Sequence, residues 1–470
     1  MRCKSTIVLL ITIELLIISI VPLTFTVDAE REAGYFVGSA KIKLTPKGND
    51  LFGIGQTYTG YYLAGYTYFI PERPMRGVHD DIWARAIAIT GADGAQNRKT
   101  VILVSLDYIG FFKMLMDPIR KEVSSLLKID SKGIIIGSTH THSSVDVLGL
   151  WSGPMFGAPK EYYDEIKSKI IKVIVDAYNN RVPAKIGVTQ VYVPGVTVNV
   201  FGGHNESLLK NESVGIIQAR DLSNKPIATV SIFGTHPEVL AGFNYDLSSD
   251  FPHYLREYIE SNNGGTALFF VGPQGDQTVN ICDDPDDATM QTAKCRTFDM
   301  ARIIGEKLGG SIIKRLQNFN DFKTDGVLDY IMVTKKISIS NENLQYAKTL
   351  ITLRARVDGR SLPPGSTESS VTETDYAYIR IANTGIATVP GEPFVAIGEK
   401  IKSMIPEKNR FVLAVTNDML GYIVPSATWN PDNYRESMSV GRHMEFVTTS
   451  TLESMINTLS VSSEISSKKP

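Results

Sequence analysis

The amino-acid sequence predicts an α/β fold, in which a mixed β-sheet with flanking helices forms a single large catalytic domain. Short apolar runs rich in β-branched residues alternate with longer segments of helical period, as expected when helices cover a sheet. Histidines and other polar residues directly follow several of these runs, which predicts a site at the carboxyl ends of the strands. No repeat of fixed period and no break in composition divides the chain.

Composition excludes some classes of function. The 470 residues are 43% hydrophobic and 21% charged, so the chain can bury a large core. A net charge of -2 provides no broad positive field, and we therefore expect no nucleic-acid partner. A small-molecule or lipid substrate is compatible with this composition, and peripheral membrane contact remains open.

The first 29 residues predict a secretory signal peptide. Arg2 and Lys4 precede an apolar run, and the small residues that end at Ala29 suit a signal peptidase. An uncleaved membrane anchor is the alternative, although Glu14 opposes it because an acidic residue costs about 2.5–3.5 kcal/mol at the centre of a spanning helix. We therefore expect a secreted or extracytoplasmic protein, with residues 30–470 as its catalytic domain.

The cysteines agree with export. Removal of the signal takes Cys3 away and leaves only Cys282 and Cys295, which predicts one disulfide bond. The loop between them carries an acidic run at residues 283–287, for which a solvated loop is favoured over a calcium site. Two Asn-Glu-Ser sequons, at Asn205 and Asn211, permit glycosylation only in a host that makes it.

The first two thirds of the chain alternate strands and helices, as βαβ units do. The expected strands are 35–46, 77–89, 100–107, 133–137, 184–198, a segment from 214, 228–237 and 267–271. The expected helices are 114–127, 161–178, 250–260 and 298–316.

The last third is expected to return to strands before a final helix. Strands are predicted between residues 327 and 354, at 377–382, at 385–389 and at 410–416. Residues 361–374 are rich in Ser, Thr and Pro and predict a surface excursion. Residues 390–399 predict a turn into a helix, and 441–458 the final helix.

The sequence Gly137-Ser-Thr-His-Thr-His-Ser-Ser-Val-Asp146 places two histidines just beyond a predicted buried strand. Side chains two residues apart in an extended segment point to the same side, so His140 and His142 can face one site. Neutral imidazole is the commonest metal ligand in proteins. Taken alone, the pair is equally well explained by one histidine that ends the strand and one that is exposed.

Three later strand ends repeat this arrangement with His236, Glu392 and Tyr422. Two imidazoles and a carboxylate suit a catalytic zinc ion, which keeps three protein ligands and an open position for water. The phenol of Tyr422 could complete that set. A glycine-rich turn at Gly275-Asp276 can present backbone N–H groups to a substrate, although such glycines more often mark only a tight turn. The aromatic loop through Gly65 can line the site, and its tyrosines are at least as well explained as cover for the core.

In the order of these motifs the sequence resembles the catalytic domain of the neutral, non-lysosomal ceramidases and their shorter prokaryotic relatives. The matching blocks lie between about residue 35 and about residue 440. They are Gly77-Val-His-Asp-Asp-Ile-Trp-Ala-Arg85, Thr139-His-Thr-His-Ser143, His236-Pro-Glu-Val-Leu240, Gly275-Asp276, Pro390-Gly-Glu392 and Gly421-Tyr-Ile-Val-Pro425.

The resemblance implies one zinc ion per chain, with ligands from His140, His236, Glu392 and Tyr422. It implies that His142 and Tyr434 lie around the scissile amide, and that the metal activates water for attack. The pair Cys282 and Cys295 resembles the disulfide of the family. The expected function is a secreted, zinc-dependent hydrolase of an N-acyl bond, in ceramide or in another N-acylated amine.

The sequence departs from the family pattern in three places. Gly-Asp-Val-Ser-Pro-Asn is replaced by Gly275-Asp-Gln-Thr-Val-Asn280, so the family serine becomes Thr278, for which a nucleophilic role is less favoured than activated water. No arginine follows Asn199. We also expect no carboxyl-terminal immunoglobulin-like domain. Two alternatives therefore stay open: a zinc hydrolase of a non-lipid amide or ester, and a non-catalytic secreted protein that binds lipid or metal.

Overall fold

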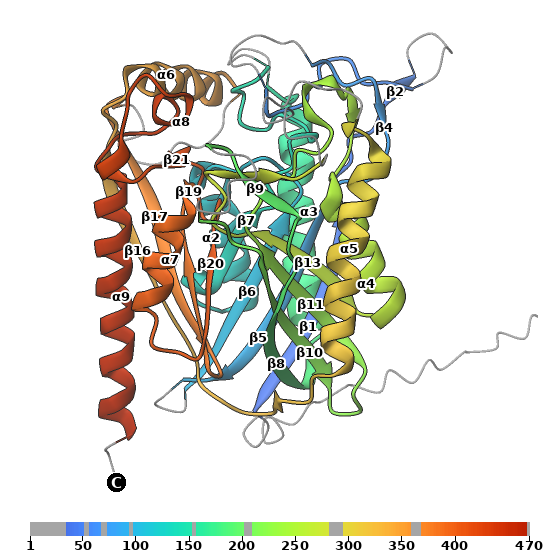
Figure 1. The fold of residues 1–470 in the computed structure, drawn as a ribbon, viewed down its shortest axis with the longest axis vertical. Coiled ribbons are helices and arrows are strands. Elements are labelled where there is room, and N and C mark those ends of the chain that lie inside the picture. Colours follow the sequence, from blue (N-terminus) through green and yellow to red (C-terminus); the bar gives the residue numbers. More distant parts are fainter. Residues whose placement is uncertain are drawn as a thin grey trace, which may run out of the picture. The chain divides into compact units, whose positions relative to one another are not determined.

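Two β-sheets packed face to face form the body of the protein (Figure 1). The computed structural model describes residues 34–50, 56–66, 73–93, 97–152, 157–201, 209–281, 295–358 and 368–467. The chain from Gly34 onward is one unit. The predicted mixed α/β fold with flanking helices is therefore confirmed.

The larger sheet has nine strands and is mixed. Its order is β13 (Thr266–Val271), β11 (Pro226–Phe233), β10 (Ser213–Asp221), β8 (Val182–Tyr192), β1 (Tyr35–Lys43), β5 (Trp83–Ala92), β6 (Arg98–Leu106) and β7 (Ile134–Ser138), with β15 (Phe322–Lys323) paired to β8. The two pairs at its ends, β11 with β13 and β6 with β7, are parallel. Both pairs therefore send their carboxyl ends toward loops of the candidate site.

The smaller sheet has four strands, in the order β16 (Leu328–Ser338), β17 (Val371–Ile381), β18 (Thr384–Thr388) and β20 (Asn409–Leu413). The pair β18 and β20 is parallel. Four further two-stranded ladders join loops: β2 (Asn49–Asp50) with β3 (Gln56–Thr57), β4 (Gly77–Val78) with β12 (Asp246–Leu247), β9 (Thr197–Asn199) with β14 (Gln277–Val279), and β19 (Glu392–Pro393) with β21 (Tyr422–Ile423).

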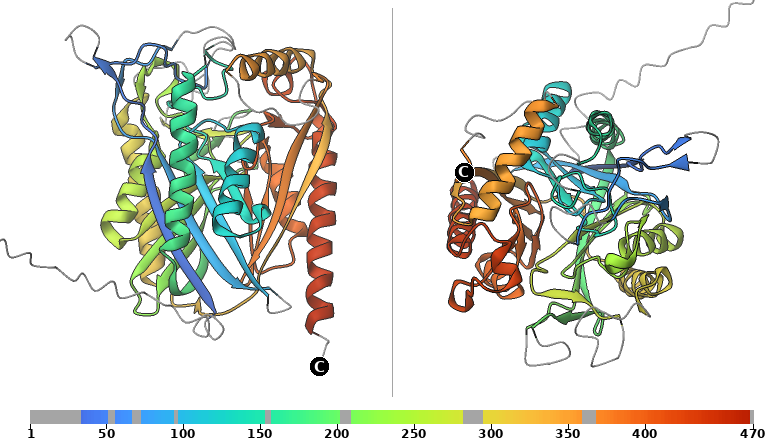
Figure 2. Two further views of the ribbon diagram at one scale, coloured as in Figure 1. Left: turned by 180° about the vertical axis from the view of Figure 1, so that it is seen from behind. Right: turned by 90° about the horizontal axis from the view of Figure 1, so that it is seen from above.

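The helices cover the outer faces of the two sheets (Figure 2). Those on the larger sheet are α2 (Lys113–Leu127), α3 (Lys160–Asn179), α4 (Phe251–Asn263) and α5 (Phe298–Gln317). Those that contribute to the core of the smaller sheet are α7 (Val395–Met404) and α9 (Met444–Ser467). Two more, α6 (Glu342–Val357) and the short α8 (Tyr434–Ser437), lie at the end of the molecule that carries β19 and β21.

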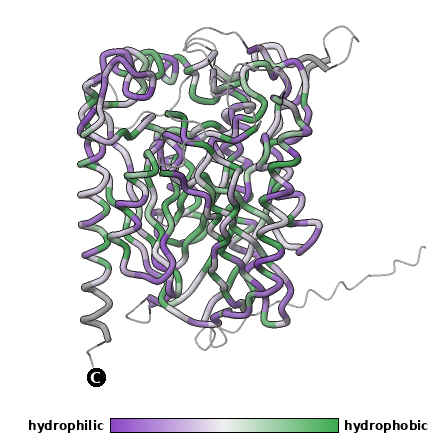
Figure 3. The backbone as a smooth tube through the Cα atoms, viewed as in Figure 1, coloured by the Kyte–Doolittle hydropathy of each residue, from purple (hydrophilic) through white to green (hydrophobic). Residues whose placement is uncertain are grey.

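The alternation of side chains between the two faces of each strand explains the four layers, in which helices cover the outer face of each sheet and the two sheets pack between them. In β5 the alanines Ala86 and Ala88 face the helices, whereas Ile87 and Ile89 face the second sheet. Since successive side chains of a strand point to opposite faces, a strand buried on both sides becomes apolar throughout. The apolar strands accordingly run through the interior in Figure 3. A strand that is apolar on both faces does not reveal whether helices or another sheet pack against it. The second sheet was therefore not predicted.

One predicted element is wrong. Strands were expected between residues 327 and 354, but only β16 is a strand and residues 342–357 form α6. The side chain of Asn341 caps this helix by accepting hydrogen bonds from the backbone N–H groups of Asn343 and Leu344. The apolar residues after the cap recur every three or four positions, which is the helical period. The first part of the predicted excursion, residues 361–367, lies outside the described residues, and its predicted end at 374 is wrong because β17 begins at Val371.

Several predictions fall outside the described residues: the signal segment 1–29, the sequon at Asn205, the acidic run 283–287 and Cys282. Cys295 is described, but its disulfide with Cys282 remains a prediction. Among the helices that are described, none is both long and apolar enough to cross a membrane.

Candidate active site

The candidate site lies between the carboxyl ends of the two sheets. His140 follows β7 and His236 follows β11, both in the larger sheet, whereas Glu392 and Tyr422 follow β18 and β20 of the smaller one. A backbone hydrogen bond from Ser138 to Val415, 3.0 Å long, joins the sheets at this end. The prediction that strand ends gather these side chains is therefore right, but two sheets contribute them rather than one.

The backbone at His140 has an uncommon conformation. Its φ of 67° lies in the left-handed region, which a residue with a side chain rarely occupies. Hydrogen bonds to the end of β6 and the bend that follows it hold the segment, since Thr139 donates to Leu106 and His140 donates to Tyr108. Residues in such conformations are often found at functional sites. The turn places the imidazoles of His140 and His142 5.0 Å apart, measured between ring centroids.

Glu392 and Tyr422 are brought together by a short parallel ladder. They are directly paired in the register of β19 and β21. Both side chains are buried, and the ring of Tyr422 lies 6.3 Å from that of His236. The ladder therefore delivers a carboxylate and a phenol to the two imidazoles.

Hydrogen bonds fix the orientation of His140 and His236. The Nδ1 atom of His140 lies 2.6 Å from the carbonyl of Ile109, and that of His236 lies 2.6 Å from the carbonyl of Gln277. Since a carbonyl only accepts, Nδ1 is the protonated nitrogen in each ring. Both Nε2 atoms are therefore lone-pair donors when the rings are neutral.

These donors converge on Glu392. Its Oε2 atom lies 3.3 Å from Nε2 of His140 and 3.1 Å from Nε2 of His236. Zinc–nitrogen and zinc–oxygen bonds of about 2.0–2.2 Å in a tetrahedral site separate neighbouring ligand atoms by roughly 3.3 Å. The spacing and the chemistry of the three donors thus fit a zinc ion.

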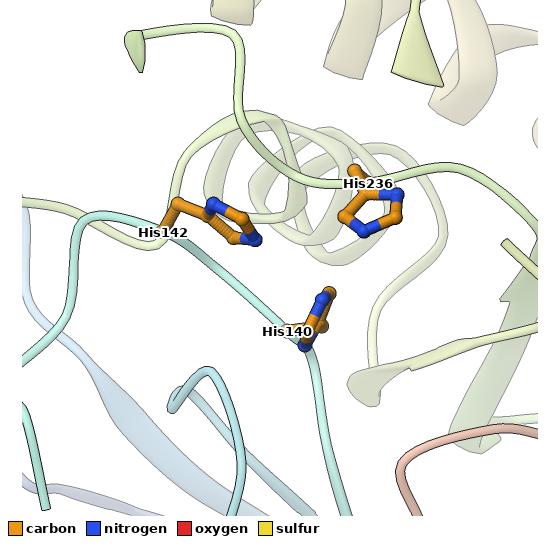
Figure 4. A group of neighbouring side chains, drawn as sticks. All are labelled: His140, His142 and His236. Carbon is orange, nitrogen blue, oxygen red and sulfur yellow. The ribbon is translucent and has the colours of Figure 1, made fainter. Parts of the chain in front are cut away.

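His142 completes a compact group of imidazoles (Figure 4). One ring nitrogen from each of His140, His142 and His236 lies within 4.8 Å of the others, and all three side chains are buried. Neither ring nitrogen of His142 has a hydrogen-bond partner in the part of the chain that the structure describes. His142 thus faces the site with its polar atoms free to act, as a further ligand or as a group that exchanges a proton.

Electrostatics separate the protonation states in the cluster. Burial alone would raise the pKa of Glu392, but His140 and His236, when protonated, supply positive charge and Nε2–H donors that outweigh burial and hold this pKa well below its usual range. Burial lowers the pKa of His142 far below its ordinary value, and the neighbouring imidazoles add to that effect. Glu392 is therefore anionic and His142 neutral at physiological pH.

Thr278 lies next to the cluster because a β-bridge pairs it with His236. Its hydroxyl donates a hydrogen bond of 2.6 Å to the carboxylate of Glu238, a buried residue for which no role was predicted. Tyr434, in α8, has an exposed fraction of 51%, and its ring lies 6.1 Å from that of Tyr422. The structure thus places Tyr434 at the exposed edge of the candidate site and Thr278 in its buried wall.

The predicted substrate-binding residues make contacts within the chain. A side chain at Gly65 would strike the ring of His142, and one at Gly275 would strike the carbonyl of Glu392. Asp276 accepts hydrogen bonds from the backbone of Val395 and the side chain of Asn199. All three therefore shape the positions of His142 and Glu392, while contact with a substrate remains a prediction.

A cavity of about 230 Å³ opens beside Glu392 and Tyr422. Its walls come from the start of α2, residues 150–151, β16, α6, β17 and the segment between β20 and β21. Most of the lining residues are apolar, including Phe112, Leu150, Trp151, Ile339, Leu344, Ala347, Ile351, Met419, Leu420 and Met438. The carboxylate and the phenol are thus next to a space that suits a hydrocarbon chain.

No protein-family model matches this chain. Neutral ceramidase A of Dictyostelium discoideum is 22% identical over 311 residues, which cover 56% of this chain and 43% of that protein. The chain therefore matches less than half the length of this curated relative. The structure of neutral ceramidase from Pseudomonas aeruginosa has a TM-score of 0.72 at 15% identity and covers 92% of this chain and 75% of that one.

A second solved structure, a ceramidase complexed with C2, has a TM-score of 0.71 at 14% identity and covers 92% of this chain and 76% of its own. The fold is therefore that of the neutral ceramidases, and the resemblance predicted from the sequence motifs is confirmed. Glu238 is the residue that sequence reasoning missed. The available signal was its place in the sequence His-Pro-Glu, two residues after a proposed ligand.

Proposed function

We propose that this chain, which shares the fold of the neutral ceramidases and resembles them in sequence, is a zinc-dependent hydrolase of an N-acyl bond. Its substrate would be a ceramide-like sphingolipid or another N-acylated amine. The observation that carries the proposal is the convergence of His140, His236 and Glu392 on one point beside an apolar cavity. Tyr422 is the fourth proposed ligand, since it is paired with Glu392 in the β19–β21 ladder.

A zinc ion bound by these residues would polarise the amide carbonyl and lower the pKa of a water molecule. The neutral imidazole of His142 accepts a proton from the attacking water and passes it to the nitrogen of the leaving amine. The oxygen of water bonds to the carbonyl carbon as the C–N bond breaks, which releases a fatty acid and an amine. The hydroxyl of Tyr434, at the rim, donates to the developing oxyanion.

The cavity favours a lipid over a small polar amide. Its apolar wall beside Glu392 and Tyr422 would accept the acyl chain and hold the carbonyl near the imidazoles. A non-lipid amide or a non-lipid ester, which has no long acyl chain, would leave this wall without a partner. We therefore infer that activity increases with acyl-chain length until the cavity is filled.

The direct test measures zinc content and fatty-acid release on the same purified protein. We expect one zinc ion per chain and hydrolysis of an N-acylsphingosine, and His140→Ala should lose both. His253→Ala is the matched control, since this partly exposed histidine pairs with Asp80 and Glu257 and lies outside the cluster. Full zinc and activity in His236→Ala would refute the ligand set. Tight zinc binding without turnover of any amide or ester would favour the non-catalytic alternative.

We also propose that the protein is exported and that a disulfide joins Cys282 and Cys295. The amino-terminal apolar run and the even cysteine count of the remaining chain support this proposal. Mass spectrometry of the mature protein should give an amino terminus after Ala29 and a mass gain of two hydrogen atoms when the disulfide is reduced to two thiols. An intact amino terminus in the membrane fraction would instead favour an anchor.

A further inference from the structure

A second buried carboxylate, Glu238, lies at the site and has no part in the reaction described above. Its exposed fraction is 6%. Its Oε1 atom accepts a hydrogen bond of 2.6 Å from the hydroxyl of Thr278, and its Oε2 atom accepts one of 3.4 Å from the hydroxyl of Tyr66. Two donors from separate segments thus fix the carboxylate, and one of its oxygens remains directed at the cluster.

That oxygen faces His142. The distance from Oε2 of Glu238 to Nδ1 of His142 is 3.7 Å. A movement of about 0.5–1 Å, which a small rotation of the ring provides, brings the pair to hydrogen-bond length. No other hydrogen-bond partner for either nitrogen of His142 occurs among the residues with described positions.

The backbone of His142 is already held in place. Its N–H donates to the carbonyl of Pro237, and its carbonyl accepts a hydrogen bond of 2.8 Å from the buried guanidinium of Arg73. Gly65 closes the other side of the ring. The orientation of the imidazole is then set by its packing against Gly65 and Tyr66 and by any interaction at Nδ1 or Nε2.

The other two histidines of the cluster, His140 and His236, show how an imidazole is oriented in this site. Each is oriented through Nδ1 by a backbone carbonyl, which leaves Nε2 unprotonated and directed inward. We propose that Glu238 does the same for His142 and is its positioning residue. It accepts the Nδ1 proton and keeps Nε2 free to take a proton from water. The inference rests on the proposed hydrolase function for its catalytic consequence, but not for the hydrogen bond itself.

The proposal assigns a different role to Thr278. Because its hydroxyl proton is donated to Glu238, Thr278 holds the carboxylate and is not placed to attack a substrate. Serine would keep this hydrogen bond, whereas alanine would remove it. A nucleophilic role would make Thr278→Ala inactive whatever residue stands at position 238.

The test follows the tautomer of His142 by 15N NMR on histidine-labelled protein, with the signal assigned by its loss in His142→Gln. The wild type should carry its proton on Nδ1. In Glu238→Gln the amide can donate to Nδ1, so the proton should move to Nε2. We expect kcat for amide hydrolysis to fall about 10²–10⁴-fold, the usual contribution of general acid–base catalysis, with KM changed less than about threefold.

Glu257→Gln is the matched control, because Glu257 faces His253 at 3.6 Å on the surface of α4. It should change neither the tautomer nor kcat. Thr278→Ser should retain the Nδ1–H tautomer and most of kcat, and Thr278→Ala combined with Glu238→Gln should be no worse than Glu238→Gln alone. The Thr278 variants also provide a test if Glu238→Gln does not fold.

An Nδ1–H tautomer in Glu238→Gln with unchanged kcat would overturn the proposal, as would an Nε2–H tautomer in the wild type. The NMR measurement needs no substrate. If the wild type shows the expected tautomer and Glu238→Gln the changed one, but no amide is hydrolysed, the proposed function fails and the positioning role stands.

Discussion

Gly65 contacts the imidazole on which the proposed proton transfer depends. Its φ of 113° favours glycine, and a Cβ atom there would lie 2.7 Å from three atoms of the His142 side chain. We predict that Gly65→Ala displaces the ring and lowers kcat about 10²-fold, since a misplacement of about 1 Å has effects of that size. Steady-state kinetics on an N-acyl substrate measures this change.

Gly264 provides the control for backbone strain alone. Its φ is 80°, but a Cβ atom there would meet no atom within 4 Å beyond its immediate chain neighbours, so Gly264→Ala adds strain without a collision. It should destabilise the fold by about 1–2 kcal/mol and leave kcat unchanged. Equal kinetic losses in the two variants would show that strain, and not contact with His142, explains the effect of Gly65→Ala.

Asp418 gives a prediction about pH. Burial raises the pKa of this carboxyl to about 6, while hydrogen bonds from the backbone of Lys113 and Met419 oppose the rise. A raised pKa means that the folded chain binds the proton more tightly than the unfolded chain. This residue therefore makes the protein less stable as pH increases from about 4 to about 6, and its effect is constant above that range.

Asp418→Asn should remove this dependence, because the amide oxygen can still accept both backbone hydrogen bonds. Relative to the wild type, the variant should gain roughly 2 kcal/mol between pH 4.5 and pH 7. Urea unfolding at the two pH values measures the difference. Parallel pH profiles for the two proteins would contradict the assignment.

At the residue scale, it was easier to predict which side chains gather at the strand ends than to predict the contacts between them. His140, His236, Glu392 and Tyr422 could be chosen because each follows an apolar strand, and strand ends meet at one edge. Glu238 could not be chosen in this way, because its partners, Thr278 and Tyr66, come from distant segments. A hydrogen bond between such segments depends on packing, which no local pattern encodes.

Among the elements, α6 was predicted incorrectly and has a part in the site. Leu344, Ala347 and Ile351 line the cavity, and their spacing places them on one face of the helix. Intervals of three and four residues are the helical period, so the prediction of a strand overlooked this spacing. The Asn341 cap was the signal that favoured a helix.

If the cavity holds the acyl chain, a larger side chain on α6 should shorten the substrate that fits. Ala347→Phe is expected to raise KM about 10–100-fold for a long-chain N-acyl substrate and to change it little for an N-acetyl substrate. Tyr346→Phe is the control, because that side chain has an exposed fraction of 63%. Equal changes in KM for the long-chain and the N-acetyl substrate would show that the cavity does not bind the acyl chain.

At the scale of the whole molecule, the fold class was predictable and the number of sheets was not. The alternation of apolar runs with helical segments indicates layers of strands and helices. Whether buried strands form one sheet or two depends on pairing between distant segments, such as β18 with β20. The described structure joins the sheets near the site through Asn417, whose side chain accepts hydrogen bonds from Arg120 and the backbone of Ile136 and donates to Thr388.

This division of the site between sheets predicts how a metal affects stability. His140 and His236 come from the larger sheet and Glu392 and Tyr422 from the smaller, so a metal ion held by all four cross-links the two layers. Zinc at a free concentration 100 times its Kd should stabilise the folded chain by about 2.7 kcal/mol if the unfolded chain does not bind it. Calorimetry should therefore give one unfolding transition whose midpoint falls when a chelator removes the zinc. Glu392→Gln and His140→Ala should each abolish that response, although they alter different sheets. If zinc instead raised the midpoint of only one of two separate transitions, the ligands would belong to a single sheet and the shared site would be wrong.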